Sequence, residues 1–117
     1  MTVCRGIRGA TIADDNTGEA IHGATTELLE ALIEENSVEE ADVASVIFTM
    51  TPDLNAAFPA AAARRLGWNS TALLGAVETD VPGSLNRCIR ILILVNTRKE
   101  PQELVNVYLR GTDTLRS

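Results

Sequence analysis

One arginine interrupts the most apolar segment of the chain. Residues 88–95 read CIRILILV, and Arg90 is the charged residue among them. Burial of a guanidinium without a partner is strongly unfavourable. Arg90 is therefore expected either to form an ion pair with an internal carboxylate or to face a pocket as the binding group for an anion.

A second arginine, Arg8, lies in another predicted strand, and Gly6 and Gly9 beside it leave room for a ligand or another backbone. Nine of the ten basic residues are arginines, whose planar fork suits carboxylate or phosphate groups. Two arginines in two core strands favour a site for a small dicarboxylate. Glu78, at the end of a predicted strand, is expected to neutralise them or to bind a ligand hydroxyl, and it can do both.

Other kinds of site find little support. No serine, cysteine or lysine has a recognisable activating base beside it, and the spacing of phosphate-binding glycine loops is absent. Cys4 and Cys88 lack zinc spacing, so each is expected to lie in a strand as a small apolar residue. His22 is interpreted as structural, and Trp68 and Tyr108, taken alone, as core packing. The sequence thus predicts no metal and no cofactor.

The charge pattern limits the partners. Residues 14–42 carry ten acidic residues and no lysine or arginine, and the net charge is −6, which disfavours binding to nucleic acid. The apolar runs are far shorter than the roughly 20 residues of a membrane span. The amino terminus shows no secretory signal. We therefore expect a cytoplasmic protein with neither membrane nor nucleic acid as a partner.

The length of 117 residues predicts a single domain over residues 1–117, with residues 111–117 as a flexible C-terminal tail. Helices are expected from an Asn16 cap to residue 36, in a short turn after Ser37, and over residues 60–66. Strands are expected at residues 3–11, 43–50, 71–77, 88–96 and 106–109. This order predicts an α+β (α/β-like) fold, a mixed five-stranded sheet with its helices on one face. Because the strands are apolar on both sides, other copies of the chain are expected to cover the opposite face.

A set of short motifs narrows the function. They are RGIRGAT (residues 5–11), TPDLNAAFPA (51–60), Glu78, VPGSL (81–85), CIR (88–90) and VYL (107–109). In their order and spacing the chain resembles the trimeric, pseudo-α/β-barrel class of chorismate mutase, over residues 3–116. The resemblance implies a homotrimer with active sites at its subunit interfaces. It also implies a cofactor-free isomerase that rearranges chorismate to prephenate in phenylalanine and tyrosine biosynthesis.

The resemblance also assigns roles to residues. Arg90 is implied to contact the ether oxygen and the side-chain carboxylate of the substrate, and Arg8 with Tyr108 to hold the carboxylate. Glu78 and the backbone N–H of Gly75 are implied to bind the ring hydroxyl. The other binding residues are Leu74, Ala76, Val77, Leu115 and Arg116 from the same chain, and Phe58, Ala60, Ala61 and Arg64 from its neighbour.

Three departures from the family pattern keep alternatives open. Gly75 stands where many relatives carry Cys or Ser, Ala61 replaces a basic residue near the pocket mouth, and the chain ends soon after Arg116. These features favour a non-catalytic trimeric module that binds a carboxylate metabolite. A trimer like the imine or enamine deaminases, which also use an interfacial arginine, is a second alternative. Conversion of chorismate to prephenate in a direct assay separates the three.

Overall fold

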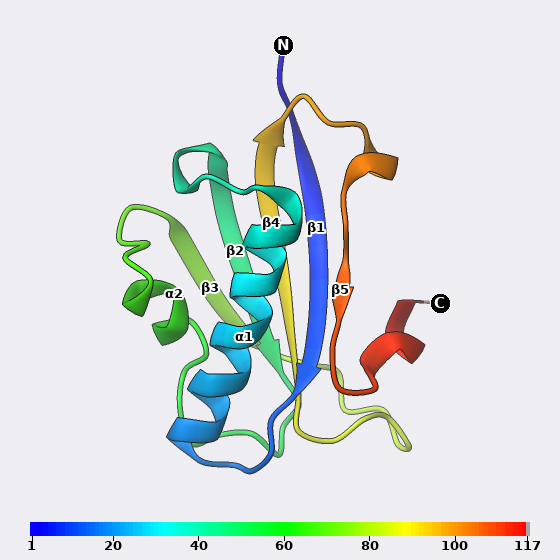
Figure 1. Ribbon diagram of the computed structural model, residues 1–117. Helices are drawn as coiled ribbons and strands as arrows, with labels where there is room; N and C mark the ends of the chain where they lie inside the picture. The colour runs from blue at the N-terminus through cyan, green and yellow to red at the C-terminus, as the bar shows by residue number, and fades with distance from the viewer. Residues whose placement is uncertain (117) are drawn as a thin grey trace.

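A mixed five-stranded sheet forms the centre of the protein. The computed structural model describes residues 1–116, with the backbone alone for Arg116. The strands are β1 (Val3–Ile12), β2 (Val43–Met50), β3 (Ala72–Val77), β4 (Cys88–Thr97) and β5 (Val107–Tyr108). They lie in the order β3-β2-β4-β1-β5, with β3 and β5 at the two edges (Figure 1). The predicted mixed five-stranded sheet is thus confirmed.

The pairing explains why the sheet is mixed. The central strand β4 is antiparallel to both neighbours, β1 and β2. The edge strands are parallel to their neighbours, β3 to β2 and β5 to β1. Every residue of β1 has a partner in β4, so the position of a side chain on one strand fixes which side chain lies beside it on the other.

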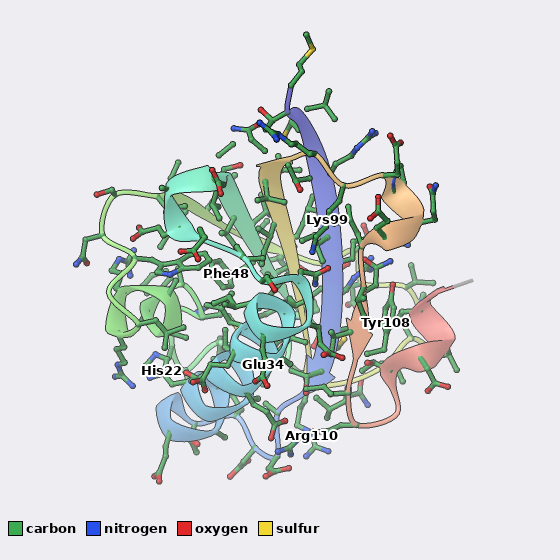
Figure 2. The ribbon with its side chains drawn as sticks, turned by 45° about the horizontal axis from the view of Figure 1, so that its top comes forward. His22, Glu34, Phe48, Lys99, Tyr108 and Arg110 are labelled. Carbon is green, nitrogen blue, oxygen red and sulfur yellow. The ribbon has the colours of Figure 1, made fainter. Side chains whose placement is uncertain are left out.

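Both α-helices lie on the same face of the sheet, as predicted. The long helix α1 (Gly18–Asn36) runs across β1 and β4, and the short helix α2 (Ala61–Arg65) packs beside it (Figure 1). Leu28 and Leu32 of α1 are fully buried against Phe48 and Ile93 from the strands. Figure 2 shows Phe48 between the sheet and the helix. Trp68 joins the same core, which confirms its packing role.

The two faces of the sheet differ sharply along β4. Ile89, Ile91, Ile93 and Val95 are buried towards the helices, whereas the alternate residues Arg90, Leu92 and Leu94 are partly exposed. Successive side chains of a strand point to opposite faces. One sheet face is therefore the core of the chain, and the other is open.

Gly9 allows α1 to approach β1 closely. A Cβ atom at this position would lie 2.9 Å from Leu28 Cδ1, 2.9 Å from Leu32 Cδ1 and 3.1 Å from the Val107 carbonyl oxygen. The predicted close approach at this glycine is thus made by α1 on one side and β5 on the other.

Three local predictions are wrong. The cap of α1 is Thr17, whose hydroxyl accepts from the Ala20 N–H, because Asn16 instead binds the segment at Asn55. Ser37 does not start the next turn but ends α1 in a left-handed conformation (φ 52°), and the 3-10 helix that follows is Glu40–Asp42. Cys4 lies in β1 as expected but is exposed, whereas Cys88 is buried.

A tight turn sets the direction of the C-terminal segment. Arg110 and Gly111 both have positive φ, 54° and 81°, and a 3-10 helix follows over Thr112–Arg116, where the sequence predicted a tail. The Thr112 hydroxyl is within hydrogen-bond distance of the Ala10 carbonyl oxygen (3.1 Å), and Arg110 pairs with Asp14 at 2.7 Å. These contacts, together with the ion pair of Arg110 and Glu27 at 3.4 Å, hold the segment against β1 and α1. Among residues 1–116, no helix has the length and apolar character needed to cross a bilayer.

Candidate active site

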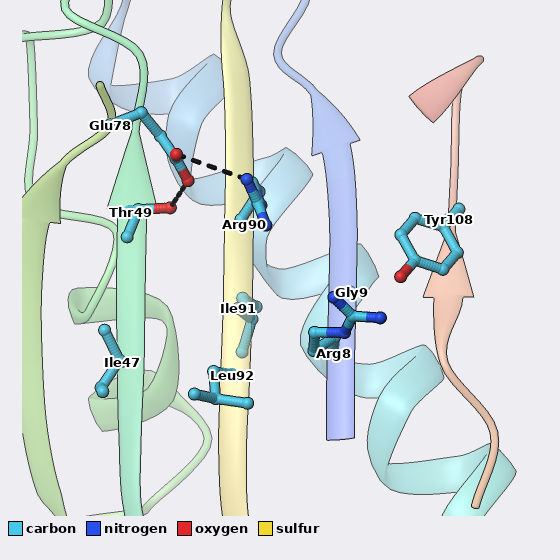
Figure 3. A pocket seen from close by; sticks show the side chains of 9 residues that line it. All are labelled: Arg8, Gly9, Ile47, Thr49, Glu78, Arg90, Ile91, Leu92 and Tyr108. Carbon is cyan, nitrogen blue, oxygen red and sulfur yellow. Dashed lines mark hydrogen bonds and ion pairs between the residues drawn. The ribbon is translucent and has the colours of Figure 1, made fainter. Parts of the chain in front are cut away.

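A cavity of about 210 Å³ lies on the open face of the sheet (Figure 3). Side chains from strands β1, β2, β4 and β5 line it, together with Glu78 just after β3. The lining residues are Arg8, Gly9, Ile47, Thr49, Glu78, Arg90, Ile91, Leu92 and Tyr108. The sequence nominated four of them, Arg8, Glu78, Arg90 and Tyr108, and the fold brings these four together.

The strand register places these groups side by side. Thr49 of β2 pairs with Arg90 of β4, and Arg8 of β1 pairs with Leu92, two residues further along β4. Arg8 and Arg90 therefore point to the same face from adjacent strands, one row apart. Ala10 pairs with both Arg90 and Tyr108, which places the tyrosine beyond β1 on the far side of the cavity.

Glu78 contacts Arg90 and Thr49 through its two carboxylate oxygens. Its Oε1 lies 3.4 Å from Arg90 Nη1, and its Oε2 accepts a hydrogen bond from the Thr49 hydroxyl. The Glu78 backbone N–H donates to the Met50 carbonyl oxygen at 2.9 Å, which extends the pairing of β2 and β3 past the end of β3. The Arg90 side chain pairs with a carboxylate, and at 39% exposure it also faces a cavity, so the expected ion pair does not exclude the expected position at a pocket. Its role as the binding group for an anion stays a prediction.

Arg8 is the less restrained of the two arginines. Within the described part of the chain its guanidinium forms no ion pair and no hydrogen bond, and Figure 3 shows the Tyr108 hydroxyl directed towards it. Its backbone is fixed, because the Arg8 N–H donates to Asn106 Oδ1 at 2.9 Å. An anion in the cavity would thus meet two cations: the Arg90 guanidinium, which Glu78 holds, and the Arg8 guanidinium, which can move to fit the anion. Tyr108 is half-buried at the cavity wall rather than in the core.

A second cavity of about 320 Å³ shares Glu78 and Arg90 with the first. Leu115 and Cys88 are among its lining residues, so the predicted site residue Leu115 shares this cavity with the two charged groups. Burial raises the pKa of the Cys88 thiol to about 11, with a smaller contribution from the negative charge of Glu78. The thiol is therefore protonated at neutral pH, which does not suit a nucleophile.

Several predicted site residues lie outside the cavity in a single chain. Those from β3 are Leu74, Gly75, Ala76 and Val77, and those in or just before α2 are Phe58, Ala60, Ala61 and Arg64. The β3 residues are exposed, and so are Phe58 and Arg64. A Cβ at Gly75 would lie no closer than 3.9 Å to the Phe48 carbonyl oxygen, an ordinary contact. The predicted position of the Arg116 side chain falls outside what the structure describes.

The sequence did not single out Thr49, Ile47 or Leu92 as cavity residues. Ile47 and Leu92 are ordinary strand residues and carry no signal of their own. Thr49 carries a weak one, because it is one of two hydroxyl residues in the otherwise apolar segment VASVIFTM. Arg90 stands out for the same reason, as a polar residue in an apolar strand.

No metal site is formed by the described residues, since no group of three or more His, Cys, Asp or Glu lies close enough together. His22 is on α1, on the other side of the sheet from the cavity. The binding groups at the cavity are two guanidinium groups, one carboxylate and two hydroxyls. Such groups bind carboxylates and hydroxyls of a small molecule by charge and by directed hydrogen bonds.

The sheet, its two helices and this cavity define a class: an α+β protein with a cavity on the open face of a mixed sheet, lined by groups suited to a small hydroxylated anion. Comparison with protein families makes the class specific, because the family described as chorismate mutase type I matches residues 4–117. The chain belongs to the type I chorismate mutase family and is an isomerase that converts chorismate to prephenate in aromatic amino acid biosynthesis.

Individual relatives agree with the family. The chain is 50% identical over 113 residues to chorismate mutase AroH from Thermus thermophilus, covering 96% of this chain and 93% of that protein. It is 42% identical over 113 residues to chorismate mutase AroH from Bacillus subtilis, covering 96% and 89%. A solved chorismate mutase from Clostridium thermocellum superimposes with a TM-score of 0.92 at 51% identity, covering 94% of this chain and 98% of that one.

Proposed function

We propose that chorismate binds in the cavity on the open sheet face and that Arg90 stabilises the transition state of its rearrangement. The observation that carries the proposal is the position of the Arg90 side chain and the number of contacts that it makes. It lines the cavity, and its contact with Glu78 is a single one of 3.4 Å, which leaves other N–H groups of the guanidinium for a ligand.

The chemistry explains why a fixed cation suffices. The rearrangement is unimolecular: the ether C–O bond breaks, a C–C bond forms, and no proton is transferred. Because breaking of the C–O bond runs ahead of C–C bond formation within this single step, negative charge grows on the ether oxygen. A cation already held in place stabilises that charge more than it stabilises the substrate, and only such differential binding raises kcat.

Positioning is the second task of the site. Chorismate must adopt a compact diaxial conformer before its reacting carbons meet, and groups that select this conformer lower the barrier. In the proposal, Arg8 and Tyr108 hold a carboxylate of the substrate, and Glu78 accepts a hydrogen bond from its ring hydroxyl. The backbone N–H of Gly75 also binds this hydroxyl, which requires no side chain at that position.

We further propose that three copies of the chain assemble and that each active site combines residues of two copies. The open face and its edge support this: Ile47, Leu92 and Leu94 are only partly buried in one chain, and Leu74 is 62% exposed. Phe58 is 80% exposed, although the next two residues, Pro59 and Ala60, are buried. Exposed apolar surface of this kind is typical of an interaction site. The cavity of a neighbouring copy would then be completed by Phe58, Ala60, Ala61 and Arg64. We place this assembly in the cytoplasm.

Complementation between variants tests the shared site. Arg90→Ala and Arg64→Ala are expected to be nearly inactive alone, as judged by loss of chorismate absorbance and formation of prephenate. Refolding the two together at equal amounts gives roughly three quarters mixed trimers, and each of these has one site of three that receives both intact residues, from different chains. About a quarter of all sites are then intact. We therefore expect about a quarter of the parent activity to return. If the mixture stays inactive while an affinity tag on one variant co-purifies the other and so shows mixed trimers, the two residues do not belong to sites shared between chains.

A further inference from the structure

We propose that Thr49 is a positioning residue that keeps the Glu78 carboxylate from closing on Arg90. The inference rests on the proposed roles of Arg90 and Glu78 and adds a third residue, which does not need to touch the substrate. The Thr49 hydroxyl has one proton, and it donates this proton to Glu78 Oε2.

The geometry shows what this hydrogen bond opposes. Thr49 and Arg90 are directly paired across β2 and β4, so both flank the Glu78 carboxylate from neighbouring strands (Figure 3). One carboxylate oxygen faces Thr49, and the other is 3.4 Å from Arg90 Nη1. A carboxylate and a guanidinium that are free to turn prefer two parallel hydrogen bonds. Here Thr49 holds one of the two oxygens, and the contact with Arg90 remains single.

The consequence concerns the charge available to the substrate. If both Glu78 oxygens bound Arg90, the carboxylate would neutralise the guanidinium more closely and two of its five N–H groups would be occupied. The carboxylate would also turn away from the position in which it can accept a substrate hydroxyl. By holding Oε2, Thr49 maintains a cation and a carboxylate as separate binding groups only 3.4 Å apart.

The test uses two substitutions at Thr49 that separate shape from hydrogen bonding. Thr49→Val keeps the branched shape and removes the donor, and we expect kcat/KM to fall by about 10- to 100-fold, the range for loss of a hydrogen bond to a charged group. The fall should come mainly from kcat, because Arg90 acts most strongly in the transition state. Thr49→Ser keeps the donor, and its kcat/KM should stay within about threefold of the parent.

A double-mutant cycle shows whether Thr49 acts through Glu78. In a Glu78→Ala background, Thr49→Val should change kcat/KM by less than about twofold, whereas a residue that only supports the strand would lower it by the same factor in both backgrounds. Thr11→Val is a matched control, since Thr11 is a fully buried threonine of β1 whose hydroxyl has no partner among the described residues. It should leave kcat/KM unchanged.

The possible results separate this inference from the proposed function. If Arg90→Ala or Glu78→Ala retains the parent turnover, the proposed site itself is wrong. If both lose activity but Thr49→Val does not, or if Thr49→Val is equally harmful without Glu78, the site stands and the positioning role of Thr49 is refuted.

Discussion

Replacement of Arg90 by alanine separates a catalytic arginine from a structural one, because the structure predicts different magnitudes for the two roles. The Arg90 side chain is 39% exposed, and it meets Glu78 through one contact of 3.4 Å. An ion pair that is this accessible to water contributes about 0–1 kcal/mol to folding. A preorganised donor aimed at the charge of a transition state contributes about 2.7–4 kcal/mol, or a factor of about 10²–10³ in kcat.

The structure supplies a matched control in the neighbouring strand. Arg5 of β1 pairs with Glu100 at 3.5 Å and has a side-chain exposure of 29%, but it does not line the candidate cavity. Arg5→Ala should therefore cause a similar small change in stability without the loss of turnover. Arg90→Lys should also be poor, since a point charge cannot bridge two oxygens as the guanidinium fork does.

The assay combines two measurements on each variant. Initial rates of chorismate loss over a range of substrate concentrations give kcat and KM, and urea unfolding at one fixed protomer concentration gives the stability, which depends on concentration for an oligomer. A folded Arg90→Ala variant with turnover within about threefold of the parent would refute the catalytic role. So would a loss of turnover that Arg5→Ala reproduces.

Three further predictions concern the scaffold. Gly9→Ala should lower the free energy of unfolding by about 1–3 kcal/mol in urea titrations, since the added Cβ would lie within 3.0 Å of two leucine side chains of the core; an unchanged midpoint would contradict this. A thiol reagent at pH 7 should modify exposed Cys4 in the native protein and leave Cys88, whose pKa is about 11, unmodified until the protein unfolds. A hydrogen bond from Thr51 lowers the pKa of Asp53. The ionised carboxylate therefore stabilises the fold at pH values above the ordinary pKa of an aspartate, and this stabilisation is lost as the pH falls through the lowered pKa. Asp53→Asn should therefore flatten the decline of stability below roughly pH 4, and an unaltered acid limb would show that the carboxylate does not contribute.

The sheet was predictable because its strands are unusually apolar. Residues 88–96 and 43–50 were both identified, and β2 has the predicted limits. A charged side chain stands out in a predicted core strand, and for this reason Arg90 and Arg8 were predictable as candidate anion-binding residues. A feature of this kind depends only on residue types along one strand, so one sequence is sufficient to show it.

Caps and turns were less predictable because the choice depends on distant residues. Asn16 and Thr17 are adjacent and both cap helices well. The structure selects Thr17 because Asn16 binds Asn55, 39 residues away. Ser37 ends α1 because its backbone is left-handed, and this conformation lets the chain turn towards β2.

Thr49 shows the limit of reading one strand at a time. Threonine is among the commonest residues of strands, so its presence in β2 carries no functional meaning by itself. It becomes informative when β4 places Arg90 opposite it and the end of β3 delivers Glu78 above it. That combination requires three strands from separate parts of the sequence.

The close approach at Gly9 has a consequence for engineering this enzyme. At Gly9 only the backbone of β1 separates the cavity from the leucines of α1. Gly9 lines the cavity, and a Cβ on it would collide with Leu28 and Leu32. Arg8, the next residue, would move with any displacement of that backbone. Substitutions that enlarge the helix-facing core, made only to raise thermal tolerance, should thus alter substrate affinity. Libraries that aim to alter selectivity should sample Leu28 and Leu32 along with the residues that line the cavity.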